Sequence, residues 1–378
     1  MKYTNKDLNR KHIMQVNIDN DGGNGAFALM YYIYKVLNND FIFDYFTMGN
    51  FKMDDVYDNI IKDGGKCFSA NLRKNKLVGH IKLPFVFYKV LKEYNYEIVH
   101  IHSEVAYKHF LYAFAAKKAG VKKIIIHSHS CNIDGNNKGI KFILHQIFKN
   151  RVNKLGTYFL ACSVPAAEWL FTSKTLHGNN YKLLHNGILP DLYKYSDEKR
   201  NKIRIKLGIN EKIVIGHVGA LKKVKNQSRL LDIMHDLNDD NYILLLVGDG
   251  EDRKEIELKL KSLNLEKRVV LLGNRTDVSD LLQAFDVFMF PSFFEGIPMA
   301  LIEAQAVGVP IIASDTINRE VAINDNITFV SLNDNNSEWI NKIKKVKNQH
   351  IKEDGFVNVS NSDYNIRRSA KMLKELYK

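Results

Sequence analysis

The chain has 378 residues, more than one ordinary hydrophobic core holds, so we expect two domains. Its 45% hydrophobic and 26% charged residues are typical of a folded globular protein, and 6 Pro and 22 Gly exclude a collagen-like or proline-rich chain. The net charge of +13 is uneven, because residues 1–190 carry 26 basic and 14 acidic residues whereas residues 191–378 carry 29 and 28. A basic half can meet an anionic membrane, a phosphorylated substrate or nucleic acid, or can simply be solvated.

Several classes of protein are not expected. The three cysteines, Cys67, Cys131 and Cys162, have no metal-ligand spacing, which argues against a disulfide scaffold or a zinc site and fits a cytoplasmic protein. No run of about 18 apolar residues occurs, so we expect no membrane-spanning helix. The N-terminus lacks the pattern of a secretory signal. No recognition motif for nucleic acid accompanies the positive charge, so we expect no nucleic-acid partner.

The first half alternates predicted strands and helices. Runs rich in β-branched and aromatic residues predict strands over 12–18, 41–48, 97–103, 122–130 and 158–163, and the segments between them predict helices over 25–37, 76–94, 106–119 and 138–154. Such alternation is typical of a parallel sheet with helices on both faces. Pro190 and a run of charges indicate a link near 186–212, so we expect an N-terminal domain of residues 1–190.

The second half repeats this α/β pattern more clearly. Strands are predicted over 213–220, 242–250, 268–273, 286–291 and 309–314, and helices over 253–265, 278–285 and 298–308, with a further helix that carries Leu230 to Leu237. In the helix 298–308 we expect Pro298 in the first turn and Gly308 just past the end. We assign residues 191–362 to a C-terminal domain. The amphipathic segment 363–378 predicts a last helix that could pack back on the N-terminal domain.

Two glutamates mark the strongest candidate site. Glu295 follows a predicted strand, and Glu303 lies eight positions later inside the next helix. The N–H groups near residues 296–299 would point out of that helix, and a helix N-terminus binds phosphate. Two carboxylates on either side of a phosphate can accept hydrogen bonds from a sugar and from a ribose. The alternative is an acid at a helix N-terminus and an unrelated surface glutamate.

The segment PSFFEGIPMALIEAQAVG (291–308) resembles the Glu–x7–Glu signature of the family 4 retaining glycosyltransferases. The stretches around VGDGEDRKEIE, GVPIIAS, LACSVPAAEWLF (160–171) and HNGI (185–188) follow the same order, so the resemblance spans roughly residues 12–320. It implies the GT-B fold, which consists of two doubly wound Rossmann-like domains facing a central cleft. It also implies that Glu295 contacts the donor sugar, that Glu303 contacts the ribose, and that Gly296, Ile297 and Pro298 lie against the donor.

The segment HVGALKKVKN (217–226) resembles the family's diphosphate-binding stretch. Gly219 and Lys225 match, but Ala220 stands where the family has arginine. Lys222 or Lys223 could supply the missing charge, although lysine does not reproduce the planar fork of arginine. The alternative is a weakened or inactive relative.

Three further groups of donor-site residues follow from the resemblance. Asn274 and Arg275, in GNRTD (273–277), would contact the nucleotide base; the alternative for Arg275 is an ion pair with Asp277 or Asp280. The pair Gly22 and Gly23, in DNDGGNGAF (19–27), resembles a loop that reaches the donor phosphate and the acceptor. A histidine at the end of the strand in IIIHSHSCN (124–132) would contact the donor sugar as a catalytic residue; spacing does not choose between His127 and His129.

The stretch 71–94 is basic and carries interleaved apolar residues. In a helix, Leu77, Ile81, Phe85 and Tyr88 would share one side, close to lysines. Such a helix can lie on an anionic membrane, or it can be a core helix with a basic solvated face.

The resemblance therefore implies a retaining glycosyltransferase of the hexosyl or N-acetylhexosaminyl type. A sugar would pass from a nucleotide sugar, most simply a UDP-sugar, to a saccharide acceptor linked to polyprenol, in exopolysaccharide or capsule biosynthesis. No cofactor and no metal are expected, because basic side chains and helix ends can neutralise the diphosphate. We expect a cytoplasmic protein with peripheral contact at the inner face of the membrane. The alternatives are a nucleotide-sugar 2-epimerase on the same fold and a non-catalytic partner of a glycosyltransferase.

Overall fold

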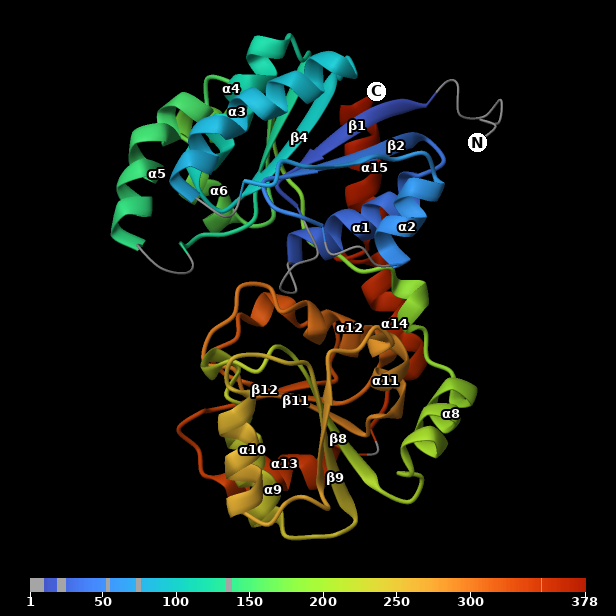
Figure 1. The fold of residues 1–378 in the computed structure, drawn as a ribbon. Coiled ribbons are helices and arrows are strands. Elements are labelled where there is room, and N and C mark those ends of the chain that lie inside the picture. Colours follow the sequence, from blue (N-terminus) through green and yellow to red (C-terminus); the bar gives the residue numbers. More distant parts are fainter. Residues whose placement is uncertain (1–9, 19–24, 52–54, 73–75, 134–137, 348) are drawn as a thin grey trace. The chain divides into compact units, whose positions relative to one another are not determined.

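The computed structural model describes the whole chain except residues 1–9, 19–24, 52–54, 73–75, 134–137 and 348 (Figure 1). The chain divides into two compact units. Unit 1 contains Met1–Asn186 together with Ile366–Lys378, and unit 2 contains Gly187–Asn365. The sequence predicted the boundaries after residues 190 and 362.

Unit 1 is a parallel sheet of seven strands in the order β3-β2-β1-β4-β5-β6-β7, with helices on both faces (Figure 1). Its elements are β1 (Lys11–Val16), α1 (Gly25–Leu37), β2 (Phe41–Thr47), α2 (Asp55–Lys62), β3 (Cys67–Ser69), α3 (Lys76–Glu93), β4 (Ile98–Ser103), α4 (Ala106–Ala119), β5 (Lys123–Ser128), α5 (Lys138–Val152), β6 (Tyr158–Ala161), α6 (Val164–Leu170), α7 (Ser173–Leu176), β7 (Tyr181–Leu183) and α15 (Ile366–Tyr377).

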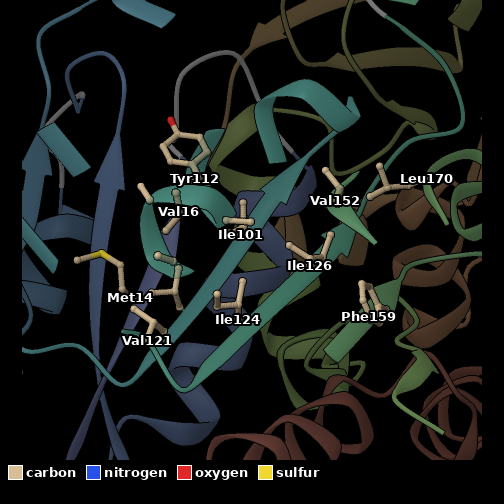
Figure 2. Packing of buried hydrophobic residues seen from close by; sticks show 14 of the residues in the cluster. Met14, Val16, Ile101, Tyr112, Val121, Ile124, Ile126, Val152, Phe159 and Leu170 are labelled. Carbon is tan, nitrogen blue, oxygen red and sulfur yellow. The ribbon is translucent and has the colours of Figure 1, made fainter. Parts of the chain in front are cut away.

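The two faces of this sheet differ in chemistry. One face is apolar and packs against α3 and α4; its residues include Met14, Val16, Ile101, Ile124 and Ile126 (Figure 2). Because side chains alternate along a strand, the residues between these point to the opposite face. The register pairs Gln15 of β1 with His100 of β4, and His102 of β4 with His127 of β5. That face therefore carries a row of buried polar side chains, which we call the polar row: Gln15, His100, His102 and His127.

The C-terminal helix α15 packs on unit 1 on the side that carries the polar row. The ring of Tyr377 meets the rings of Phe41 and Phe43 edge to face, with centroids 5.5 and 6.2 Å apart. Lys374 Nζ lies 2.7 Å from both carboxylate oxygens of Asp40. Hence the last helix completes the unit formed by the first half of the chain.

Unit 2 is a parallel sheet of six strands in the order β10-β9-β8-β11-β12-β13. Its elements are η2 (Pro190–Tyr193), α8 (Asp197–Leu207), β8 (Ile213–Val218), η3 (Lys223–Lys225), α9 (Gln227–Leu237), β9 (Tyr242–Val247), α10 (Arg253–Ser262), β10 (Val269–Gly273), α11 (Val278–Ala284), β11 (Val287–Phe290), α12 (Met299–Val307), β12 (Ile311–Ser314), η4 (Arg319–Val321), β13 (Ile327–Val330), α13 (Asn336–Val346) and α14 (Lys352–Asn361). Its strands β8, β9, β11 and β12 are almost entirely buried, as expected for a sheet covered on both faces.

The structure corrects the sequence prediction in several places, and it adds elements that were not expected: α2, α6, α7, β7, β13, α13 and α14. The expected link 186–212 contains the helix α8, whose Ser196 accepts a hydrogen bond from Lys199 N as the N-cap. Pro298 is the N-cap of α12 and precedes its first turn, whereas Gly308 ends that helix with φ 78° as expected. The short strand β3 was not expected. Among the described helices, none combines the length and apolarity that a membrane crossing requires.

Candidate functional site

An ion pair joins two of the predicted donor-binding residues of unit 2. Lys225 Nζ lies 2.7 Å from Glu295 Oε1, and both side chains are mostly buried, with 20% and 13% of their surface exposed. The ammonium group also lies over the ring of Phe290, 5.0 Å from its centroid. Lys225 follows β8 and Glu295 follows β11, the two neighbouring strands at which the strand order reverses. Open α/β sheets bind ligands at this switch point, beyond the carboxyl ends of the strands.

Backbone contacts hold the loops of this site together. Phe293 N donates to Val224 O at 2.8 Å, and this bond ties the loop after β11 to the one after β8. A third loop, after β9, approaches equally closely at Gly248, where φ is +129° and a Cβ atom would lie 2.2 Å from Gly219 O. Only glycine fits there, because it has no Cβ and tolerates that φ. The loop at Gly219 therefore packs tightly against its neighbours.

The N-terminus of α12 is the helix end that the sequence predicts to bind phosphate. Because α12 begins at Met299, Gly296 and Ile297 lie in the loop before it, and its unpaired N–H groups start later than expected. Gly296 is exposed, and a Cβ there would meet no atom within 4 Å. The loop thus leaves space for a ligand in front of the helix.

Glu303 lies in the second turn of α12. Burial raises the pKa of its carboxyl to about 7, and a hydrogen bond with Tyr193 opposes this shift. A carboxyl group with this pKa changes charge near neutral pH, so its ability to accept hydrogen bonds from hydroxyl groups depends on pH. Perturbed carboxyl groups of this kind are common at functional sites.

The side chains of the remaining predicted residues of unit 2 form no hydrogen bond or ion pair with Lys225 or Glu295 in the described structure. Arg275 Nε and Nη2 donate to the two carboxylate oxygens of Asp277 at 2.8 and 2.6 Å, which is the ion pair that the sequence offered as the alternative to base binding. Asn274 is exposed beside it. Ala220, where the family has arginine, is exposed, and so are Lys222 and Lys223.

Unit 1 brings together the two candidate histidines of β5 and places them in a larger cluster. His127 and His129 lie next to His100 and His102, with ring centroids between 4.0 and 5.3 Å apart. Burial is the main cause that lowers the pKa of each, to about 3 for His129 and well below 6.5 for the other three. All four imidazoles are therefore neutral near neutral pH. Gly22 and Gly23 lie outside the described residues.

Three of these histidines lie close enough together to bind one metal ion. Ligand atoms of His100, His102 and His127 lie within 4.8 Å of one another. The sequence by itself indicated no role for His100 and His102, and it did not predict that β4 and β5 would align them with His127 and His129. The signal that could have found the cluster is the shared H-x-H spacing at the ends of two adjacent strands.

The chain is similar in sequence and in structure to known glycosyltransferases. The family model "Glycosyl transferases group 1" matches residues 199–359. The chain is 30% identical to the putative glycosyltransferase EpsF of Bacillus subtilis over 67% of this chain and 68% of that protein. It is 27% identical to the UDP-Gal:alpha-D-GlcNAc-diphosphoundecaprenol alpha-1,3-galactosyltransferase of Escherichia coli over 81% of each.

A solved structure has the same fold over nearly its whole length. The complex of Anabaena HepE with UDP-glucose superposes with a TM-score of 0.74 and 19% identity, covering 96% of this chain and 98% of that one. The fold is thus GT-B, and the matches favour a transferase over the epimerase that shares this fold. The similarity to EpsF over two thirds of both chains agrees with the two doubly wound sheets, and it shows that the chain belongs to the group 1 glycosyltransferase family.

Proposed function

We propose that the protein transfers a hexose or an N-acetylhexosamine from a UDP-sugar to a polyprenol-linked saccharide, with retention of anomeric configuration, in the synthesis of a surface polysaccharide. The observation that carries this proposal is the contact of Lys225 with Glu295 in front of α12. The names of the Escherichia coli and HepE relatives, which state a UDP-sugar donor or ligand, support the choice of nucleotide.

The site can stabilise a leaving diphosphate by charge. The ammonium group of Lys225 is held in place by Glu295 and by the ring of Phe290. Because it is already positioned, the side chain needs little reorganisation to face an anion. A diphosphate would compete with Glu295 for the ammonium group, and the displaced carboxylate could then accept hydrogen bonds from the sugar. Catalysis would be mainly electrostatic, with the N–H groups of α12 and Lys225 opposing the charge that develops as the glycosidic bond breaks. No metal enters this mechanism.

A substitution at Glu295 tests the proposal. Glu295→Gln should nearly abolish sugar transfer to a polyprenol-diphosphate saccharide, because Glu295 contacts the sugar once the diphosphate has displaced it from Lys225. UDP affinity, measured by calorimetry, should be equal to or higher than that of the wild type, because the neutral amide no longer competes with the diphosphate for the ammonium group. Asp315→Asn, an acid of another loop of the same unit, serves as the matched control. Full turnover by Glu295→Gln would remove this residue from the site, and the anomeric configuration of the wild-type product, read by NMR, decides between retention and inversion.

We also propose that unit 1 docks on an anionic membrane through α3 and α5. On α3, Ile81 and Phe85 are 69% and 74% exposed, which agrees with the predicted apolar side. On α5, Ile140 and Ile143 are 63% and 59% exposed. The helix α5 carries three lysines, one arginine and no acidic residue, so its exposed apolar groups lie among basic side chains of the same helix. Exposed apolar side chains among lysines are typical of an interfacial helix.

Binding to vesicles tests this docking surface. The wild type should sediment with anionic phosphatidylglycerol vesicles, less with neutral phosphatidylcholine vesicles, and less at high salt. The double variant Ile81→Ser/Phe85→Ser should bind at least tenfold more weakly, since burying one such side chain is worth roughly 1.5–3 kcal/mol. Leu258→Ser is the matched control, because Leu258 is 70% exposed on α10 of unit 2. The proposal would be contradicted if the double variant and Leu258→Ser bound anionic vesicles equally well.

A further inference from the structure

Gln15 lies at the centre of the polar row inside the sheet of unit 1. Its Nε2 donates to the hydroxyl of Tyr377 at 3.2 Å, and its Oε1 lies 2.9 Å from His102 Nε2. Both polar ends of one amide are thus engaged, and Gln15 itself is fully buried. Each end starts a separate chain of hydrogen bonds.

The first chain runs through Tyr377 to His127. Tyr377 Oη lies 2.7 Å from His100 Nδ1, and His100 Nε2 lies 3.1 Å from His127 Nδ1. The second chain is shorter, because His102 Nδ1 lies 2.8 Å from His129 Nε2. The far ring atoms of both chains, His127 Nε2 and His129 Nδ1, are buried and have no hydrogen-bond partner within the described structure.

The proton positions in both chains follow from the orientation of the amide. Each histidine is neutral, so each ring carries one N–H and one lone pair. Tyr377 accepts from Gln15 and must use its only proton on His100 Nδ1, so His100 donates from Nε2 to His127 Nδ1.

The second chain obeys the same rule. His102 donates from Nε2 to Gln15 Oε1, so its Nδ1 accepts from His129 Nε2. All four rings are therefore Nε2–H tautomers. At the two ends that have no partner in the described structure, His127 Nε2 carries an N–H donor and His129 Nδ1 carries a lone pair.

We propose that Gln15 and Tyr377 are positioning residues that set the tautomers of His127 and His129, so that the pair offers one donor and one acceptor to the substrate. Such a pair fits a sugar phosphate, which has oxygen acceptors and hydroxyl donors. The substrate part of this inference rests on the proposed function. The tautomers themselves do not, because they follow from the fold of unit 1 alone.

A metal ion on His100, His102 and His127 would require a different arrangement. Both ring nitrogens of His102 are already engaged by Gln15 and His129, so a metal would break one of these bonds. Metal analysis of the purified protein separates the two arrangements. A stoichiometric divalent cation whose removal changes the histidine signals would overturn the proposal.

Nitrogen-15 NMR of histidine-labelled protein is the decisive measurement, because it reports which ring nitrogen carries the proton without any turnover. We expect His100, His102, His127 and His129, assigned by single substitutions, to be Nε2–H tautomers. In Tyr377→Phe the signals of His100 and His127 should change to a mixture of tautomers while His102 and His129 keep theirs. Tyr45→Phe is the matched control, because it removes a buried hydroxyl that has no partner in the described structure, from the strand next to Gln15.

Three results would overturn the proposal: an Nδ1–H tautomer at any of the four rings in the wild type, equal changes in both chains in Tyr377→Phe, or no change at all. Addition of UDP-glucose, UDP-galactose and their N-acetyl analogues to the wild type then tests the substrate part. A shift of His127 Nε2 supports contact with the substrate. Intact tautomers without a shift would count against the roles of the histidines in the proposed function and leave the network as derived.

Discussion

The two units have the same topology at their switch points but use it differently. In unit 1 the order reverses between β1 and β4, and in unit 2 between β8 and β11. Unit 1 places neutral histidines inside the sheet at this point, whereas unit 2 places a charged pair, Lys225 and Glu295, in the loops beyond it. Unit 2 buries its two charges as an ion pair, because the desolvation of an unpaired charge is costly, while neutral imidazoles can be buried if their nitrogens are paired. The unit with the charged pair is therefore suited to hold a diphosphate, and the unit with the neutral network is suited to orient hydroxyl groups.

Loss of the cation in unit 2 has the largest expected effect. Lys225→Ala should lower turnover by about 10²–10³, since removal of one preorganised charge-stabilising donor costs that much. Lys261→Ala, at an exposed lysine of α10 in the same unit, should stay near the wild-type rate. Ala220→Arg should be tolerated, because the family has arginine there and the position is exposed. Steady-state kinetics checks all three, and a wild-type rate in Lys225→Ala would place the diphosphate elsewhere.

The carboxyl of Glu303 gives unit 2 a dependence on pH that the neutral histidines of unit 1 do not share. With a pKa of about 7 it is mainly protonated at pH 6 and mainly ionised at pH 8. If the carboxylate binds the ribose, UDP affinity should rise with pH across this range. Glu303→Gln should weaken UDP binding at pH 8 by roughly 1.5–3 kcal/mol, as expected for charge-assisted hydrogen bonds.

Calorimetry at several pH values tests this assignment. The phosphate of UDP also titrates near pH 6, so the comparison between the wild type and Glu303→Gln isolates the contribution of Glu303. The difference in affinity should shrink as pH falls through 7. The same affinity for both proteins at pH 8 would show that Glu303 does not contact the nucleotide.

The buried network makes the stability of unit 1 sensitive to one hydroxyl. Tyr377→Phe leaves Gln15 Nε2 and His100 Nδ1 without partners, which should lower the free energy of unfolding by about 1–3 kcal/mol. Tyr45→Phe should change it little, because that buried hydroxyl has no partner in the described structure. Urea unfolding monitored by circular dichroism provides the comparison, and similar losses in both variants would mean that the network adds no stability.

The smallest expected effect concerns an ion pair on the surface of α15, the helix that carries Tyr377. Lys374 and Asp40 form an ion pair, but the two side chains are 37% and 36% exposed. Lys374→Ala should lower the free energy of unfolding by only about 0–1 kcal/mol, the usual range for exposed pairs. A larger loss that diminishes in high salt would show that α15 is held to unit 1 by charge more than by the packing of Tyr377.

Local patterns in the sequence predicted most of the elements that line the candidate sites. The helix with Glu303 was readable from the signals at its two ends, Pro298 before it and Gly308 after it, and Gly308 adopts the left-handed conformation that ends the helix. The strands of both sheet centres were readable as apolar runs. The helix α8 was missed because its sequence, DEKRNKIRIKL, is mostly charged, and β3 was missed because three half-exposed residues carry no period.

The sequence alone thus predicted the α/β fold class from local periodicity. Its resemblance to the family 4 glycosyltransferases predicted the family and the candidate pair of glutamates, because the motif consists of residues close together along the chain. Only the tertiary structure decided which side chains meet. Lys225 contacts Glu295, and Gln15 contacts Tyr377 from 362 positions away, because parallel strands and a returning helix bring distant segments to one point. The proton positions in the histidine row are likewise a property of the assembled network, since each ring takes its tautomer from its neighbour.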